Sequence, residues 1–328
     1  MPINLKGRSL LTLNDYKASE INFLLDSSIE FKRLKYQGIF PKNLRNRNIT
    51  LIFLKPSCRT RSSFVVAAAD EGAHLEIFPK EDIRFGLKES TKDIARVLGR
   101  MFDGIAFRGF EHSLVQEIAQ YAGVPVWNGL CDMYHPTQAL ADLMTVKEEF
   151  GRIEKIKLSY VGDGRNNVAN SLIIVALKMG FNLTILAPRS LWPSKDFIQK
   201  ITENTRRMEG IVKGSVEVTD NIEKGIDKSD VVYSDVWVSM GEENLIAERI
   251  ALLKDYKITR KLMSLTNKPE TIFLHCMPAL HDLNTEMARK YPDILEVDDD
   301  VFESHQSRAL DQAENRMHTI KAVMVATI

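Results

Sequence analysis

Short apolar segments recur along this chain and are separated by longer segments with the periodicity of helices. Most of the apolar segments do not alternate with polar residues, which is typical of parallel strands that are covered on both faces. The predicted strands are residues 49–53, 104–107, 124–127, 157–161, 183–186, 231–236 and 271–274. Helical patterns cover residues 90–101, 113–122, 137–150, 168–179 and 196–209. The alternation predicts an α/β fold with open parallel sheets.

The length of the chain, 328 residues, suits two domains better than a single core. The helical pattern that ends at Phe150 is followed by Gly151, a favourable residue at a helix C-terminus. A new strand-turn-helix pattern begins at Lys157. We therefore predict domains at residues 1–150 and 151–312, with a closing amphipathic helix over residues 313–328.

The overall charge argues against some classes of partner. Lys plus Arg and Asp plus Glu number 44 each, so the formal net charge is zero. This balance disfavours a general nucleic-acid or anionic-membrane surface. No segment approaches the ~20 apolar residues that span a bilayer, and no signal peptide is evident. The three cysteines are far apart and odd in number, so we expect no disulfide framework and a cytoplasmic location.

The segment Ser57-Cys58-Arg59-Thr60-Arg61 lies between the first predicted strand and a helical pattern that begins near Phe64. Two hydroxyl groups, the Arg59 guanidinium and the free N–H groups of a helix N-terminus would together bind a phosphate. A solvated basic turn would have the same composition, so the segment alone leaves both interpretations open.

Other polar residues also follow predicted strands, where ligands bind in open α/β sheets. Asn167 ends the turn after residues 157–161, which lacks the third glycine of a dinucleotide fingerprint and better suits a carboxylate. A nicotinamide-dependent dehydrogenase is thus disfavoured. Asp235 could accept from an ammonium group. Taken singly, the remaining candidates are also explained as a helix cap, a surface turn or ordinary surface and helix arginines: Arg108, His135, Ser239, Met240 and Arg316.

The turn His275-Cys276-Met277-Pro278 allows two chemical roles for its cysteine. Cys276 could be a nucleophile, because a neighbouring histidine is a common partner of catalytic thiols. No aspartate that would orient such a base is evident, so we favour a site where the thiol and adjacent carbonyls receive an amine. The histidines show no metal-ligand spacing, and we expect no metal and no cofactor.

Together and in this order, the motifs resemble those of the aspartate/ornithine transcarbamylase family, from Leu10 through Ile328. The shared segments are residues 88–90, 95–101, 107–110, 135–138, 275–278 and 311–316, with Asp235 and Ser239-Met240-Gly241. The resemblance implies two open parallel-sheet α/β domains with the active site in the cleft between them and the last helix packed on the first domain.

The resemblance also implies residue roles. Carbamoyl phosphate would contact Ser57, Cys58, Arg59, Thr60, Arg84, Arg108, His135, Gln138, Cys276, Met277 and Arg316. Ornithine would contact Asn167, Asp235, Ser239 and Met240. The catalytic residues would be Arg108, His135, Asp235 and Cys276.

The implied reaction is transfer of the carbamoyl group of carbamoyl phosphate to the δ-amine of L-ornithine, giving L-citrulline and phosphate. It would serve arginine synthesis or, in reverse, arginine breakdown in the arginine deiminase pathway. Aspartate is disfavoured as the acceptor, because the chain offers Asp235 and has no arginine in residues 278–281. Two alternatives are carbamoyl transfer to putrescine and a catalytically weak homologue that acts as a binding or assembly subunit.

The chain departs from the family pattern at several positions. Cys58 stands where threonine or methionine is usual, Arg84 where glutamine or histidine is usual, and Met277 where leucine is usual. In the family the loop around Arg84 reaches the active site of a neighbouring subunit. The resemblance therefore implies a homotrimer of identical subunits, or a dodecamer of such trimers.

Overall fold

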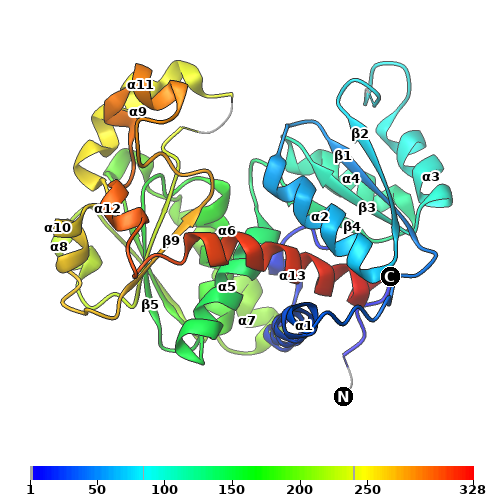
Figure 1. Cartoon of the computed structure of the whole chain (residues 1–328), viewed down its shortest axis with the longest axis horizontal. Coiled ribbons are helices and arrows are strands. Elements are labelled where there is room, and N and C mark those ends of the chain that lie inside the picture. The colour runs from blue at the N-terminus through cyan, green and yellow to red at the C-terminus, as the bar shows by residue number, and fades with distance from the viewer. Residues whose placement is uncertain (1–2, 84, 239–240) are drawn as a thin grey trace. The chain divides into compact units, whose positions relative to one another are not determined.

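The computed structural model describes residues 3–83, 85–238 and 241–328, which form two compact units (Figure 1). Unit 1 comprises Met1–Met144 together with Glu314–Ile328, and unit 2 comprises Thr145–Ala313. The chain passes from unit 1 to unit 2 inside helix α5 (Pro136–Phe150).

Unit 1 contains a four-stranded parallel sheet in the order β2-β1-β3-β4. The strands are β1 (Asn48–Phe53), β2 (His74–Pro79), β3 (Gly104–Arg108) and β4 (Val126–Leu130). The helices are α1 (Ala18–Tyr36), α2 (Cys58–Glu71), α3 (Thr91–Met101), α4 (His112–Ala122) and α13 (Ala309–Thr327), with a short 3-10 helix η1 (Leu13–Asp15).

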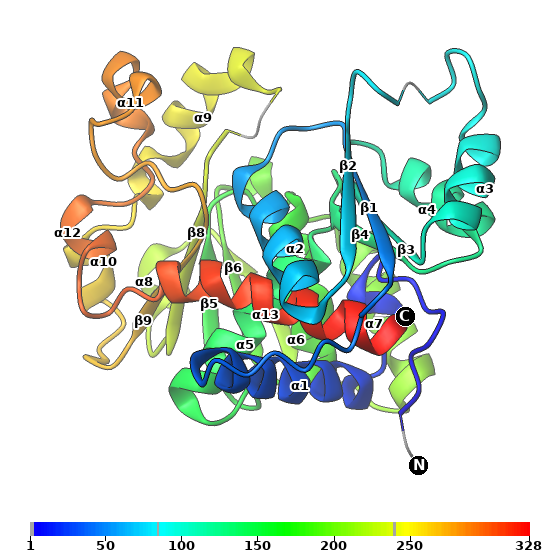
Figure 2. The same cartoon turned by 45° about the vertical axis from the view of Figure 1, so that its right-hand side comes forward.

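Helices cover both faces of this sheet, which explains why its inner strands are apolar on both sides. On one face, the ring of Trp127 stacks on Phe64 of α2, and its Nε1 donates to Oγ1 of Thr327 in α13. On the other face, Ile105 and Phe107 belong to a core cluster with residues of α3 and α4. Figure 2 shows α2 and α13 on the same side of the strands.

Unit 2 contains a five-stranded parallel sheet in the order β7-β6-β5-β8-β9. The strands are β5 (Lys157–Val161), β6 (Asn182–Leu186), β7 (Ser215–Thr219), β8 (Val231–Asp235) and β9 (Ile272–Cys276). The helices are α6 (Asn167–Met179), α7 (Lys195–Glu209), α8 (Ile222–Ile226), α9 (Ile246–Leu253), α10 (Arg260–Ser264), α11 (Glu286–Lys290) and α12 (Asp299–Phe302). Short 3-10 helices are η2 (Arg189–Leu191), η3 (Glu243–Leu245), η4 (Lys254–Tyr256) and η5 (Pro292–Ile294).

Each sheet has a point at which the strand order reverses. In unit 1 the chain moves from β1 outward to β2 and then returns to β3 on the other side of β1. In unit 2 it moves from β5 through β6 to β7 and then returns to β8 beside β5. Loops leave neighbouring strands in opposite directions at such a point, so a crevice forms there at the carboxyl ends of the strands. Both groups of polar residues described below lie at these two positions.

The predicted α/β class with parallel sheets is confirmed, and every predicted strand overlaps an observed one. Strands β2 and β7 were not predicted. Both lie at sheet edges, and their residues alternate between exposed and half-buried positions, so they lack a continuous apolar segment. The last helix begins at Ala309, earlier than the predicted residue 313.

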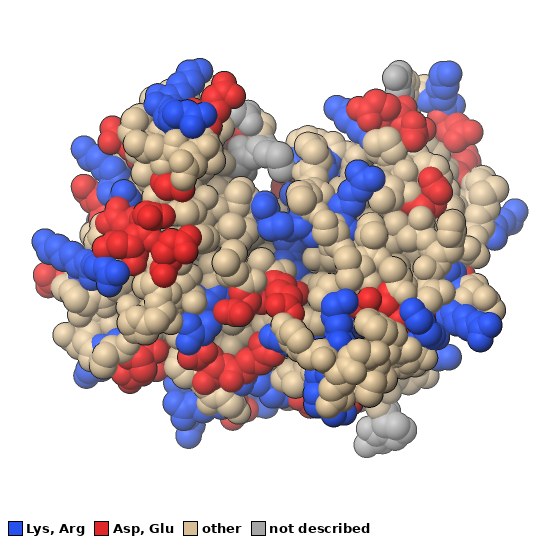
Figure 3. All heavy atoms as spheres, viewed as in Figure 1, with Lys and Arg blue, Asp and Glu red and all other residues tan. Residues whose placement is uncertain are grey.

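Charged side chains of both signs are mixed over the face in Figure 3. Within the described ranges, none of the helices has the length and apolar character needed to cross a membrane.

Candidate active site

The phosphate-binding segment predicted from the sequence forms the start of α2, directly after β1. Ser57 is the N-cap residue, and its Oγ accepts from the backbone N–H of Thr60 at 3.2 Å. Thr60 is buried. Its Oγ1 accepts from Nη1 of Arg108 at 3.2 Å and from Nη2 of Arg316 at 2.7 Å. Residues from α2, β3 and α13 therefore bring two buried guanidinium groups to one hydroxyl group beside a helix N-terminus.

Arg108 is the last residue of β3, and the end of this strand lies close to Thr60. The pairing of β3 with β4 shifts register between Phe107, which pairs with Asn128, and Arg108, which pairs with Leu130, so Gly129 has no register partner on β3. A Cβ atom on Gly129 would lie 3.2 Å from Cγ2 of Thr60 and 3.3 Å from the carbonyl oxygen of Phe107. Glycine at position 129 therefore permits the close approach of β4 to Thr60.

His135 lies just before α5, and its side chain is buried. Burial lowers the pKa of His135 well below its usual value, and the positive charges of Arg316, Arg108 and Arg59 lower it further. The imidazole is therefore neutral at pH 7. Arg59, whose side chain is half-buried, is the residue after Cys58 in the first turn of α2.

The Thr137 hydroxyl is coupled to the tautomer of the His135 ring. Oγ1 of Thr137 donates to the carbonyl oxygen of Gly129 at 3.3 Å and lies 3.3 Å from Nδ1 of His135. While the hydroxyl donates to Gly129, it can only accept from Nδ1–H, and Nε2 is then an acceptor. When the hydroxyl proton turns to Nδ1, the ring proton is on Nε2, which can then donate to a ligand oxygen.

Gln138, in the first turn of α5, has an orientation fixed by a neighbour on the same helix. Its Nε2 donates to Oδ1 of Asp142 at 2.8 Å, and both side chains are buried. The amide nitrogen is thus used within the protein, and the amide oxygen is the atom available to accept from a ligand NH₂ group. Cys58 is the first residue of α2 and its side chain is exposed, so its backbone N–H is a donor of the helix N-terminus. Arg84 lies outside the described residues.

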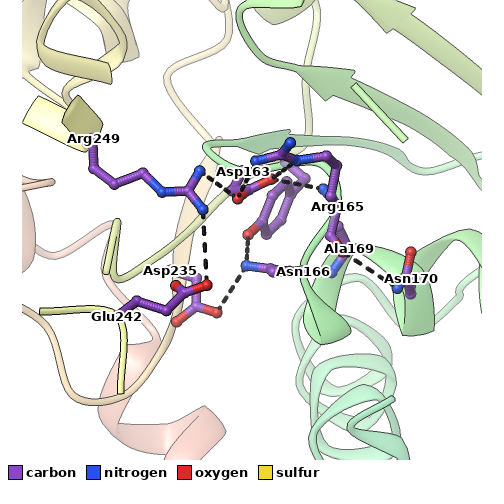
Figure 4. A network of polar contacts seen from close by, with 9 residues as sticks. Asp163, Arg165, Asn166, Ala169, Asn170, Asp235, Glu242 and Arg249 are labelled. Carbon is purple, nitrogen blue, oxygen red and sulfur yellow. Dashed lines mark hydrogen bonds and ion pairs between the residues drawn. The ribbon is translucent and has the colours of Figure 1, made fainter. Parts of the chain in front are cut away.

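Asp235 is the centre of a second polar network, in unit 2 (Figure 4). It is the last residue of β8 and is buried. Its Oδ2 accepts from Nδ2 of Asn166 at 3.3 Å, and its Oδ1 accepts from the backbone N–H of Val236 at 2.8 Å. Asn166 also caps α6 through Oδ1, and its Nδ2 donates to the Tyr160 hydroxyl at 2.6 Å. Strands β5 and β8 are adjacent, so the network lies at the reversal point of this sheet.

The surroundings of Asp235 make it a strong acceptor for a cation. Burial raises the pKa of Asp235 to about 7, and the charges of Glu296 and Asp163 raise it as well, whereas His275 and the N–H of Val236 lower it. A buried carboxylate of this kind gains most when a ligand brings a positive charge.

Several members of this network were missed by sequence reasoning. Nη1 of Arg249 lies 2.7 Å from Oδ2 of Asp163, and the backbone N–H of Arg165 donates to Oδ1 of Asp163 at 2.9 Å (Figure 4). The turn that contains Asp163 was visible in the sequence, but Arg249 lies on α9 without any motif around it. Asn167, predicted to hold a carboxylate, is the first residue of α6, next to the cap residue Asn166. The predicted ligands Ser239 and Met240 lie outside the described residues.

Cys276 is the last residue of β9 and is buried next to Asp235, its register partner on β8. Nε2 of His275 lies 3.1 Å from Oε1 of the buried Glu296. Successive side chains of a strand point to opposite faces, so the His275 ring is directed away from the Cys276 thiol. The local geometry therefore does not favour a Cys276–His275 nucleophile pair. Met277 follows the strand and packs against the core cluster of unit 2.

One group of side chains has the composition of a metal site. Ligand atoms of His281, Asp299 and Glu303 lie within 4.8 Å of one another. Nδ1 of His281 is 2.7 Å from Oδ1 of Asp299, and the ring stacks on Phe302. A hydrogen-bonded histidine–aspartate pair accounts for this arrangement without an ion.

Two family models together match most of the chain. The carbamoyl-P binding domain of aspartate/ornithine carbamoyltransferase matches residues 8–148, and the Asp/Orn binding domain matches residues 154–327. The chain belongs to the aspartate/ornithine carbamoyltransferase family. The cluster around Thr60 lies in the first matched region of this carbamoyltransferase, and the network around Asp235 lies in the second.

Individual relatives of this carbamoyltransferase are similar over their full length. The chain is 57% identical over 325 residues to "Ornithine carbamoyltransferase 2, phaseolotoxin-insensitive" of Pseudomonas syringae pv. actinidiae, covering 99% of this chain and 98% of the relative. It is 51% identical over 331 residues to the catabolic ornithine carbamoyltransferase of Bacillus licheniformis, again covering 99% and 98%. The solved ornithine carbamoyltransferase of Pyrococcus furiosus superposes with a TM-score of 0.90 at 39% identity, covering 99% of this chain and 98% of that one.

Proposed function

We infer that this protein transfers the carbamoyl group of carbamoyl phosphate to the δ-amine of L-ornithine, giving L-citrulline and phosphate. The observation that carries this inference is the convergence of Arg108 and Arg316 on Thr60, in the region that matches a carbamoyl phosphate-binding domain. Full-length relatives named ornithine carbamoyltransferase support the choice of acceptor.

The phosphate of the first substrate would bind at the start of α2. Ser57, Arg59 and the free N–H groups of the helix offer donors there, with Arg108 and Arg316 beside them. A helix N-terminus and guanidinium groups together favour a dianion. The Gln138 amide oxygen would accept from the carbamoyl NH₂, and Nε2 of His135 would donate to the carbamoyl oxygen.

Ornithine would bind to unit 2. The α-ammonium would be held by Asp235, the α-carboxylate by Asn167 and the Ser239-Met240 segment, and the δ-amine by Cys276 and neighbouring carbonyl groups. The buried Asp235 supports a ligand with a cationic group here.

The reaction would begin when the neutral δ-amine attacks the carbamoyl carbon. A C–N bond forms, the C–O bond to phosphate breaks with its electron pair leaving on phosphate, and the amine loses one proton to phosphate or solvent. Negative charge develops on the carbamoyl oxygen in the transition state. Arg108, Thr60 and the neutral His135 would stabilise it, and a preorganised donor of this kind is worth roughly 2.7–4 kcal/mol.

We further propose that the enzyme is a cytoplasmic homotrimer, or a dodecamer of trimers, in which Arg84 contributes to a neighbouring site. The thiols of Cys58, Cys131 and Cys276 are all free, which supports a reducing compartment. Native mass spectrometry would measure the subunit number. Arg84→Ala would raise the KM for carbamoyl phosphate if Arg84 binds that substrate in the assembly, and unchanged kinetics would contradict this role.

The substrate assignment is tested by steady-state assay of the ureido product with carbamoyl phosphate and one of three acceptors. We expect kcat/KM for ornithine to exceed that for putrescine and aspartate by at least about 10²-fold, since a site built for a charged group leaves buried polar atoms unpaired with the wrong acceptor. A higher value with putrescine would transfer the assignment to putrescine. Absence of product with every acceptor would support a binding or assembly subunit.

A further inference from the structure

The neighbourhood of Asp235 contains two other acidic residues, and each of them has a basic partner. Oδ2 of Asp163 lies 2.7 Å from Nη1 of Arg249, and Oε1 of Glu296 lies 3.1 Å from Nε2 of His275. Asp235 itself forms no ion pair with any residue that the structure describes. Of these three carboxylates, Asp235 is therefore the one left for a ligand cation.

The pair between Arg249 and Asp163 is shielded from solvent. Arg249 exposes 5% of its surface, and the Asp163 side chain exposes 11%. Asp163 has a second basic partner in Arg165, whose Nε lies 3.3 Å from Oδ1 of Asp163, but the Arg165 side chain is 48% exposed. Removing Arg249 therefore takes away the buried partner and leaves only the solvated one. Glu242 is a weaker second partner, because its Oε1 lies 4.0 Å from Nη2 of Arg249 and its side chain is 41% exposed (Figure 4).

Asp163 also connects Arg249 to the geometry around Asp235. Oδ1 of Asp163 accepts from the backbone N–H of Arg165, which fixes the turn between β5 and α6. The next residue, Asn166, caps α6 and donates to Asp235. The orientation of the Asn166 amide therefore depends on a turn that Arg249 holds through Asp163.

We propose that Arg249 is a positioning residue for the amino-acid substrate: it holds Asp163 and compensates its charge, so that Asp235 remains available to an ammonium group. The proposal rests on the proposed function, because it assigns this network to the ornithine site. Arg249 acts through Asp163 and Asn166, without touching the substrate.

The charge on Asp163 affects the pKa of Asp235. The groups whose charges or dipoles act on Asp235 are Asp163, Glu296, His275 and the N–H of Val236, and Tyr160 and Cys276 lie next to it. Asp163 raises the pKa of Asp235, so loss of Arg249 would raise this pKa further. The Asp235 carboxyl would then be neutral over a wider range and would bind an ammonium group less tightly near neutral pH.

The test is the pH dependence of L-norvaline binding, measured by calorimetry with enzyme saturated with carbamoyl phosphate. L-norvaline has the α-ammonium and α-carboxylate of ornithine but no δ-amine, so it cannot react and adds no δ-amine titration. Between about pH 5.5 and 8.5, the wild-type Kd should fall as Asp235 ionises.

The expected effects have opposite signs in two variants. Arg249→Met should move the midpoint of the Kd profile up by about 0.5 to 1 pH unit, which is roughly a three- to ten-fold weaker Kd below the midpoint. Asp163→Asn should move it down. The double variant, which removes both charges, should have a midpoint close to that of the wild type. Arg260→Met, which breaks the exposed pair with Asp300, is the matched control and should leave the midpoint unchanged.

An unchanged midpoint in Arg249→Met would overturn the proposal, as would a double variant displaced as far as Arg249→Met. If Arg249→Met does not fold, Asp163→Asn still tests the proposal. A midpoint of its Kd profile equal to or above that of the wild type would contradict the influence of the Asp163 charge on Asp235. Wild-type citrulline formation is assayed in parallel. If the wild type forms citrulline but the wild type and Arg249→Met have equal midpoints, only the role proposed for Arg249 is contradicted. If the wild type neither binds L-norvaline nor forms citrulline, the proposed function itself is contradicted.

Discussion

Nη2 of Arg316 donates to Oγ1 of Thr60 over 2.7 Å, although the two residues are 256 positions apart in the chain. Arg316 lies on α13, whose residues from Glu314 onward belong to unit 1, and Thr60 lies in the first turn of α2. The same Oγ1 accepts from Arg108. One hydroxyl group therefore contacts both buried arginines that we assign to the phosphate.

Thr60→Val tests this arrangement. Valine has nearly the same shape but no hydroxyl group, so the two guanidinium groups lose a shared acceptor. We expect kcat to fall about 10²- to 10³-fold, because a preorganised transition-state contact is lost, and the free energy of unfolding to fall by about 1–3 kcal/mol. Thr60→Ser keeps the hydroxyl and should retain most of the activity. Equal activity in both variants would show that the hydroxyl is not required.

Gly129→Ala tests the close approach of β4 to α2. The added Cβ would lie 3.2 Å from Cγ2 of Thr60, so Thr60 must shift or β4 must move away. We expect the KM for carbamoyl phosphate to rise while the KM for ornithine changes little, with a stability loss of about 1–3 kcal/mol. Thr60→Ser removes Cγ2, so the double variant should recover part of the loss. Failure of the serine to improve Gly129→Ala would locate the strain at the Phe107 carbonyl instead.

His135 predicts a pH dependence of stability with a defined sign. Its folded pKa lies well below its usual value, while the unfolded pKa is about 6.5. Below pH 6.5 the unfolded chain therefore binds a proton that the folded chain excludes, so this residue contributes stability above that pH which is lost as the pH falls. His135→Asn should flatten the decline in the free energy of urea unfolding between about pH 7 and 5. The contribution of Asp235 to the pH dependence of stability has the opposite sign, because its folded pKa is raised to about 7. Asp235 is present in both the wild type and His135→Asn, so it does not affect their comparison.

The control for this measurement is His74→Asn, which removes an exposed imidazole. A His135→Asn profile parallel to that of the wild type would show that the imidazole is not held neutral in the folded protein.

Cys276→Ala separates amine binding from covalent catalysis. The thiol lies on the strand position next to Asp235, and the His275 side chain points to the other face of the sheet. We expect a raised KM for ornithine with kcat reduced but measurable, and no carbamoyl adduct on the wild-type enzyme by intact mass spectrometry. Complete loss of turnover together with an adduct on Cys276 would establish a nucleophilic cysteine.

Much of the fold followed from local patterns in the sequence. Inner strands such as β5 and β8 are rich in apolar residues and buried at nearly every position, because helices cover both of their faces. The edge strands β2 and β7 were missed, since their partly exposed residues remove that signal. The order of the strands, and so the reversal points at which the sites lie, depends on contacts that no local pattern encodes.

The residues of the candidate sites also divide into those that local sequence patterns reveal and those that depend on tertiary contacts. Thr60, Arg108 and His135 sit at strand ends or helix starts, where a polar residue after an apolar segment is visible in the sequence. Burial of the His135 side chain was not visible, because it depends on tertiary packing. Arg249 carried no signal at all, since its partner Asp163 is distant in the chain and an arginine in an amphipathic helix is usually exposed.

The most direct test of the central claim follows the labelled carbonyl carbon of ¹³C-carbamoyl phosphate by NMR, with ornithine or putrescine as the acceptor. The account predicts that the wild-type enzyme moves the label into L-citrulline with release of one phosphate per citrulline, and that Asp235→Asn slows this transfer mainly through the KM for ornithine. Transfer of the label to putrescine in preference to ornithine, or an Asp235→Asn enzyme with an unchanged KM for ornithine, would contradict it.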